Sequence, residues 1–204
     1  MGHRMRLNDL FETWGTEPLL ISTATNGLRP EKDRLLAVAA QTISDAPMEI
    51  VFNKTTGEEL LAAQKHHQIT EDMMRDWGRD EKDFTQRVEE LFKGKTLFSY
   101  SASFQYGFLS RYLEDPSLSI YDLSIVEQAL RKGLRFDEEE LLTSGKFYQA
   151  CSAVFYPLPV NSICRNLGTT RQTSPGQLPL ERSLDVLLML YTAASSQDLQ
   201  LLPS

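Results

Sequence analysis

The chain has 204 residues, of which 41% are hydrophobic and 9% aromatic, and this suits one globular domain with a full-sized core. The formal net charge is −7, so the sequence gives no support for a broad basic surface that neutralises many phosphates. The first residues lack the apolar core of a signal peptide, no apolar stretch is long enough to span a bilayer, and the two cysteines form no CxxC motif. These features predict a cytoplasmic protein with reduced thiols.

The first part of the chain predicts an appended helix followed by three strands. An amphipathic helix is expected in an N-terminal appendage at residues 1–16, because apolar residues recur there at helical spacing: Leu7, Leu10, Phe11 and Trp14. "PLLIST", "RLLAVAAQTI" and "MEIVFN" read as strands, and the turn signal "TNGLRPEKD" separates the first two. Connections this short join antiparallel neighbours, so the three strands predict a meander.

The middle of the chain predicts strands that alternate with helices. A polar segment at 54–70 leads into a short helix near Glu71 to Trp77, and "DEKDFTQRVEELF" predicts a longer helix with Asp80 as its N-cap. "KTLFSYS" and "LSIYDL" are strands, each followed by a helical pattern, which indicates parallel crossovers. We therefore predict an α/β domain at 17–194. Its five-stranded mixed sheet has three antiparallel strands, then two parallel crossover strands, with helices on both faces.

An aromatic-rich segment follows at about 134–160, where we expect a helical insertion. Its side chains, Phe147 and Tyr148 among them, could stack on bases or fill a pocket of a partner. The alternative is that they only extend the core. "LPLERSLDVLLMLYTAA" predicts a long amphipathic last helix, and residues 195–204 a flexible tail.

Five stretches of the chain, taken in order, carry a resemblance to a known family. They are "LLISTATNGL", "HQIT", "YSASFQYGFL", "IYDLS" and "LPLERSLDVLLMLY". In this order they resemble the motifs of the DEDDh 3′–5′ exonucleases of the ribonuclease-H-like fold, typified by the proofreading subunit of bacterial replicative polymerase. The resemblance covers about residues 17–194, and although each motif alone is weak, the order and the intervals fit.

The resemblance implies where the catalytic residues should stand, and most of them are replaced. The Asp and Glu of the first motif correspond to Ser22 and Ala24, and the Asp of the second to Gln105. The general-base His falls on Leu180, and only the last Asp is kept, as Asp185. The family uses two divalent metal ions, and hard cations require anionic oxygen ligands. We therefore expect no metal site, no cofactor and no exonuclease activity of the family type; loss of the base alone typically costs about 10²–10⁴-fold in rate.

A rearranged carboxylate set is the alternative that would keep an active nuclease. Glu181 and Asp185 stand four residues apart and share a helix face, and Asp122 ends a strand in the same half of the domain. The simpler interpretation, which we favour, is that Glu181 is a solvated helix residue, Asp122 caps the following helix and Asp185 is a remnant.

The remaining candidates concern binding rather than catalysis. His67 could shape its loop or contact a substrate, and three arginines could meet phosphates or pair locally: Arg165, Arg171 and Arg182. Two functions are thus expected of a degenerate exonuclease: docking of a protein partner, for example in a replication, repair or defence assembly, and binding of single-stranded nucleic acid without cleavage. No membrane partner is expected, and the sequence leaves the oligomeric state open.

Overall fold

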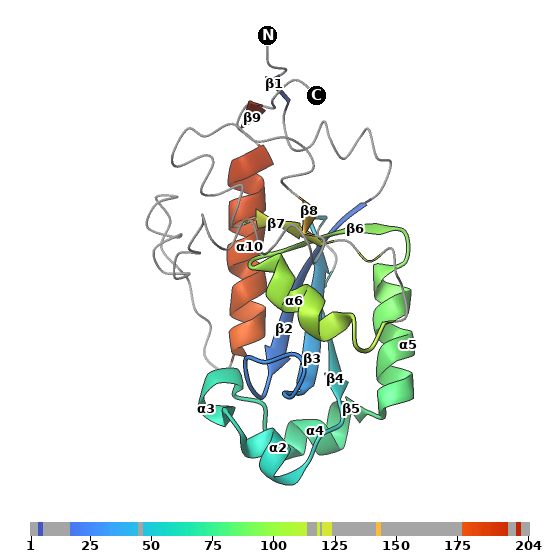
Figure 1. The fold of residues 1–204 in the computed structure, drawn as a ribbon. Helices are drawn as coiled ribbons and strands as arrows, with labels where there is room; N and C mark the ends of the chain where they lie inside the picture. Colours follow the sequence, from blue (N-terminus) through green and yellow to red (C-terminus); the bar gives the residue numbers. More distant parts are fainter. Residues whose placement is uncertain are drawn as a thin grey trace.

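The computed structural model describes residues 4–5, 17–44, 47–113, 118, 120–123, 142–143, 177–195 and 199–200. Most of the strands lie in one mixed sheet of seven, in the order β5-β4-β3-β2-β6-β7-β8 (Figure 1). Helices cover both faces of this sheet, so the predicted fold class is confirmed.

All five predicted strands are present, with the predicted directions. They are β2 (Glu17–Thr25), β3 (Leu35–Thr42), β4 (Glu49–Asn53), β6 (Lys95–Ser99) and β7 (Ile120–Asp122). Strands β2, β3 and β4 pair antiparallel, whereas β6 pairs parallel with both β2 and β7. The carboxyl ends of β2, β6 and β7 therefore lie at the same edge of the sheet.

The predicted strand number was too low, because the sheet has two further strands at its edges. Strand β5 (Gly78–Arg79) pairs parallel with β4, and β8 (Leu142–Thr143) pairs antiparallel with β7. A strand of two residues shows no alternating pattern from which it could be predicted. β8 also replaces helix within the predicted insertion at 134–160, the rest of which lies outside the described residues.

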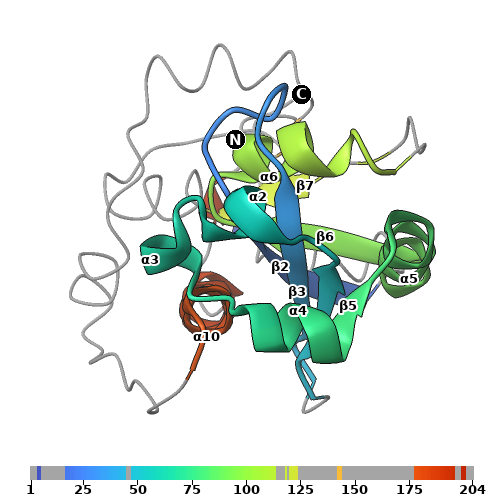
Figure 2. The same cartoon turned by 90° about the horizontal axis from the view of Figure 1, so that it is seen from below.

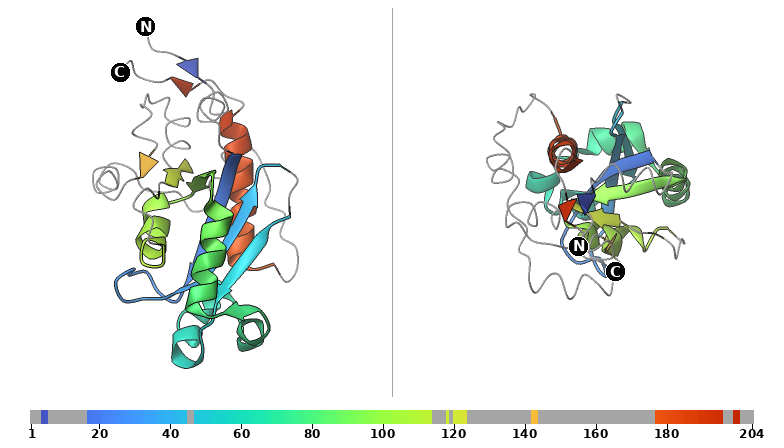
Figure 3. Two further views of the ribbon diagram at one scale, coloured as in Figure 1. Left: turned by 90° about the vertical axis from the view of Figure 1, so that its right-hand side faces the viewer. Right: turned by 90° about the horizontal axis from the view of Figure 1, so that it is seen from above.

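Three helices position the core. Helix α10 (Pro179–Ser195) packs on β2 and β3, whereas α5 (Glu81–Phe92) and α6 (Ala102–Leu109) pack on the opposite face. Figures 2 and 3 show α10 on one side of the strands and α5 on the other. The predicted cap of α5 is confirmed, since the backbone N–H of Asp83 donates to Asp80 Oδ1 over 3.0 Å.

Alternate side chains of β2 point to opposite faces of the sheet and are buried in two different apolar clusters. Leu19 and Ile21 are buried in the apolar cluster beneath α5 and α6, and Leu20 and Ala24 in the cluster beneath α10. Side chains two residues apart share a face of a strand, so Ser22 also faces α10.

The polar segment at 54–70 contains two short helices that the sequence did not predict. It forms helices α2 (Gly57–Leu61) and α3 (Gln64–His67) before the predicted α4 (Glu71–Trp77). Leu60 and Ile69 are fully buried in the core beneath α10, which fixes the segment although it looks hydrophilic overall.

A second, separate ladder joins residues near the two ends of the chain. Strand β1 (Arg4–Met5) pairs antiparallel with β9 (Leu199–Gln200). These residues fall within the expected appendage and tail, and the helix expected near residues 7–14 lies outside the described residues. In the part of the chain that the structure describes, no helix is long and apolar enough to cross a bilayer.

Candidate functional site

The end of β2 carries the first two residues that the resemblance places in an active centre. Ser22 and Ala24 are both buried, at 6% exposure each. The register with β3 shifts between Ala24 and Thr25, and the chain then turns back through Asn26 and Gly27. Such irregularities at strand ends re-aim the following residues.

The turn after β2 is held by its own polar groups. Asn26 Oδ1 accepts from the backbone N–H of Arg34 over 2.6 Å, and Thr25 Oγ1 donates to the carbonyl of Gly27 over 2.6 Å. A Cβ on Gly27 would lie 2.2 Å from a carboxylate oxygen of Asp33, so a larger residue here would require the Asp33 side chain to move. These local contacts hold the turn without any ligand.

Leu180 occupies the place where the resemblance puts the general base, at the start of α10. Its side chain is 3% exposed and belongs to the same apolar cluster as Ala24. Leu184, Phe98 and Leu178 complete this part of the cluster. An aliphatic side chain cannot accept a proton, and a methyl group cannot bind a cation, so these two positions contribute packing alone.

Gln105 lies on α6 and is 8% exposed. Its buried Oε1 has no hydrogen-bond partner. A neutral amide oxygen can bind a cation, but it contributes no negative charge to a site for divalent ions.

The charged residues at the start of α10 form hydrogen bonds with other groups of the same chain. Asp185 Oδ2 accepts from Gln177 Nε2 over 2.7 Å, and Glu181 Oε2 accepts from the backbone N–H of Leu178 over 2.5 Å. Arg182 Nη1 donates to the carbonyl of Gln177 over 2.6 Å. Glu181 thus caps the helix rather than being simply solvated, and Arg182 is tied to the preceding loop.

Asp122 holds the start of α6, a role that the sequence did not predict, and the start of the following helix, which it was predicted to cap, lies largely outside the described residues. Its Oδ2 accepts from the backbone N–H of Ala102 over 2.9 Å, and its Oδ1 from that of Ser101 over 3.2 Å. The carboxylate is 4% exposed. The sequence could not show this contact, because parallel pairing of β6 with β7 brings Asp122 opposite Ser99, at the point where α6 begins.

His67 is 4% exposed, and both of its ring nitrogens are used within the loop. Nδ1 accepts from the backbone N–H of Ile69 over 3.0 Å, and Nε2 faces the carbonyls of Leu60 and Ala62 at 3.1 Å each. This arrangement favours the loop-shaping role over a contact with a substrate.

The burial of His67 predicts a dependence of stability on pH. Burial lowers the pKa of the imidazole below its usual 6.5, although the two carbonyls act in the other direction. The unfolded chain then takes up this proton at a higher pH than the folded chain. The contribution of neutral His67 to stability is therefore complete above about pH 6.5 and declines as the pH falls towards the lowered value.

Urea unfolding followed between pH 7.5 and 5 should show this decline in the unmodified chain and a smaller one in His67→Gln, which cannot titrate. An equal decline in both chains would contradict the assignment.

The potential metal ligands among the described residues do not cluster. Among them, no group of three or more His, Cys, Asp or Glu side chains is placed to share a metal ion. The acids proposed for a rearranged set, Asp122, Glu181 and Asp185, therefore do not form such a group. Four of the predicted binding residues cannot be placed, because they lie outside the described residues: Phe147, Tyr148, Arg165 and Arg171.

Comparisons with known proteins place the fold. No family model and no curated protein matches the chain. Among solved structures, apo Exonuclease I matches with a TM-score of 0.58 at 17% sequence identity, over 87% of this chain and 42% of its own. A zinc-bound complex of E. coli Exonuclease I with single-stranded DNA matches with a TM-score of 0.60 at 16% identity, over 87% and 41%.

The chain has the Exonuclease I fold. This confirms the predicted ribonuclease-H-like architecture. A complex of Exonuclease I with an SSB C-terminal peptide matches in the same way, with a TM-score of 0.57 at 16% identity, over 87% and 41%. The chain spans about two fifths of the length of these Exonuclease I chains. Identity this low shows a shared fold, and a fold does not fix a function.

Proposed function

We propose that the chain is a catalytically degenerate member of the DEDDh exonuclease group, a pseudo-exonuclease that acts as a binding module for a protein partner. The observation that carries this proposal is the burial of Ala24 and Leu180 in one apolar cluster beneath α10. An active centre of the group needs a carboxylate and a proton acceptor at these positions, and both would have to be solvated or paired with metal.

The charge available at the remaining positions supports the same conclusion. Ser22 and Gln105 are neutral, so Asp185 is the one anion among the five positions, and it already accepts from Gln177. Two divalent ions beside a single carboxylate would repel each other without compensation.

Single-stranded nucleic acid is the second candidate ligand. The matched Exonuclease I structures include complexes with single-stranded DNA and dT13 and dA16 oligonucleotides. The net charge of −7 argues for the protein partner, because it opposes the approach of a polyanion.

The experiment offers labelled single-stranded DNA and RNA to the protein with Mg²⁺ or Mn²⁺. We expect no shortening of either strand, and no difference between the unmodified chain and Asp185→Ala. Metal-dependent shortening that Asp185→Ala abolishes would overturn the proposal in favour of the rearranged carboxylate set.

The same oligonucleotides, without metal, test the second candidate. Binding of nucleic acid would appear as an affinity that falls steeply as salt is raised, since it releases counterions. We expect a partner protein to show a weaker dependence on salt and the oligonucleotides to show no saturable binding.

A further inference from the structure

A groove of about 720 Å³ opens where β4, α4 and the first turn of α10 meet. Its apolar wall includes Ile50, Phe52, Met73 and Trp77, and two acids, Asp76 and Glu181, also line it. The volume is that of a site for a few side chains or a small ligand.

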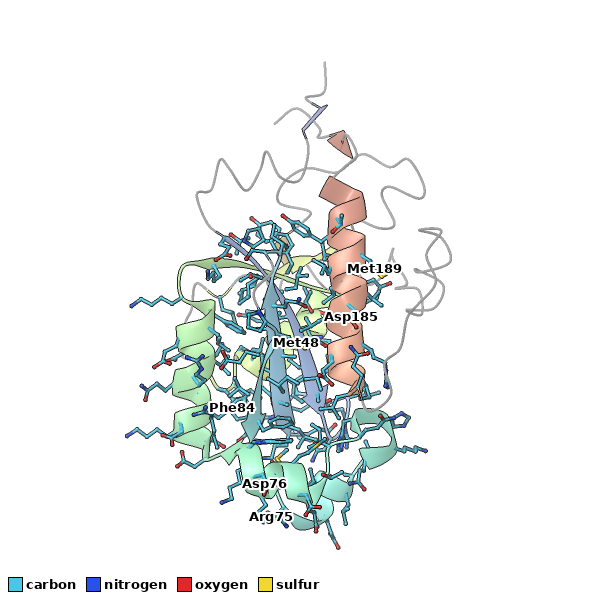
Figure 4. All side chains as sticks on the ribbon, turned by 180° about the vertical axis from the view of Figure 1, so that it is seen from behind. Met48, Arg75, Asp76, Phe84, Asp185 and Met189 are labelled. Carbon is cyan, nitrogen blue, oxygen red and sulfur yellow. The ribbon has the colours of Figure 1, made fainter. Side chains whose placement is uncertain are left out.

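The groove exists because α10 leaves the end of the sheet unoccupied. This helix packs on β2 and β3, whereas α5 covers β4 on the other face of the sheet. Met48, just before β4, and Ile50, within it, pack against the cluster beneath α10 and are consequently only partly buried. The view from behind in Figure 4 shows Met48 beside the strands, Asp185 and Met189 on α10, and Asp76 with Arg75 on α4 below them.

Trp77 gives the groove a large and rigid apolar surface. The side chain is 59% exposed, yet its ring packs on buried Phe52 with 6.1 Å between ring centroids and 31° between ring planes. The indole is thus held in place while much of its area faces solvent. Exposed tryptophans fixed in this way are typical anchors of protein interfaces, and neighbouring Met73 adds an adaptable side chain.

The surroundings of the groove are acidic. Residues 71–83, which form α4, β5 and the start of α5, carry six acidic and three basic side chains. Exposed Arg75 lies 2.7 Å from Asp72 and 3.2 Å from Asp76, so this group of one base and two acids keeps a net negative charge at the surface. Arg79 is the basic residue in the groove itself, against Asp76 and Glu181. The lining thus has two acids against one base and residues 71–83 have an excess of acids, so the charge balance favours a basic partner.

We propose that the groove docks a basic segment of a partner protein. The segment inserts one large apolar side chain against Trp77 and Met73 and places lysines or arginines beside Asp76 and Glu181. Apolar contact supplies the affinity and the acidic surroundings select the partner by charge. The inference rests on the proposed function, because it gives the chemistry of the partner that the non-catalytic module binds.

The probe is a dye-labelled synthetic peptide of 18 residues, with lysine and leucine at helical spacing and one central phenylalanine. A second peptide has glutamate in place of every lysine. Fluorescence anisotropy measures binding to the full chain at low and at physiological salt. We expect the lysine peptide to bind saturably, with an affinity at least tenfold above that of the glutamate peptide.

Two variants and two matched controls locate the site. Trp77→Ala and Asp76→Lys should each weaken binding of the lysine peptide tenfold or more. Leu61→Ala removes another exposed apolar side chain, and Glu89→Lys reverses an exposed charge on α5, so both should change the affinity less than twofold. Thermal unfolding of all four confirms that each variant is folded.

Three results would overturn the inference. The first is that the glutamate peptide binds as tightly as the lysine peptide. The second is that Arg79→Glu loses binding of the lysine peptide while Trp77→Ala and Asp76→Lys keep it, and the third is that none of the groove variants weakens this binding. The test is independent of the nuclease assay: oligonucleotide cleavage would overturn the proposed function without affecting the peptide result, and failure of the peptide would leave the absence of cleavage intact.

Discussion

Replacing Ala24 with glutamate is expected to lower the free energy of unfolding by about 3 kcal/mol or more. The carboxylate would enter an apolar cluster that also contains Leu180, Leu184 and Phe98, and every buried member of this cluster is uncharged. Its longer side chain would also have to displace well-packed atoms. A glutamate at position 24 is thus expected to destabilise this core.

Urea unfolding of Ala24→Glu and Ala24→Gln, each with and without Mn²⁺, measures this effect. The Gln variant has nearly the same size without the charge, so the difference between the two isolates the cost of burying the carboxylate. A stable Ala24→Glu chain, or one that Mn²⁺ restores, would indicate a metal site that is still prepared to bind.

Replacing Asp122 with alanine is the second change with a large expected effect, a loss of about 3 kcal/mol in the free energy of unfolding. Two backbone N–H groups at the start of α6 would lose their charged acceptor, and hydrogen bonds to charged groups contribute about 1.5–3 kcal/mol each. A metal ligand would behave differently, because removal of an unpaired acid from a cluster of acids tends to leave stability unchanged or to raise it.

Thermal and urea unfolding of Asp122→Ala should be compared with Asp122→Asn and Asp185→Ala. The asparagine keeps one acceptor oxygen, so we expect an intermediate loss. Asp185 is partly exposed and its described contact is the one to Gln177, so its loss should cost less than about 1 kcal/mol. Equal stability of Asp122→Ala and the unmodified chain would contradict the capping role.

The main strands and helices could be predicted because each carries a pattern of sufficient length. The spacing of Phe84, Val88 and Phe92 predicts α5, and all three are buried as that spacing requires. The runs "PLLIST", "RLLAVAAQTI" and "MEIVFN" predict β2, β3 and β4, since short turns separate them. Local sequence is enough where the element is long and one face is buried.

Other elements depend on contacts between residues that are distant in the chain, and the sequence of these elements shows no such pattern. Strands β5 and β8 exist because a neighbouring strand offers them hydrogen bonds. Helices α2 and α3 are fixed by burial of Leu60, His67 and Ile69 within a segment that is polar overall. The cap that Asp122 provides crosses from β7 to the helix after β6, which only the parallel pairing brings close.

The candidate site shows the same division. The residue types alone show that Ser22 and Ala24 carry no charge. That both are buried on the face towards α10 could be known only from the register of the sheet. The groove at Trp77 was not predicted at all, because the sequence shows only the end of a short helix there. The feature of the sequence that could have indicated it is Trp77, a large aromatic residue directly after a short segment rich in acidic residues.

The most direct test of the account is a calorimetric titration of the unmodified chain with Mn²⁺ at neutral pH. We predict no saturable heat up to millimolar metal, because the five positions that the resemblance assigns to the active centre carry one carboxylate. Saturable binding of two Mn²⁺ ions per chain, lost in Asp185→Ala, would contradict the account.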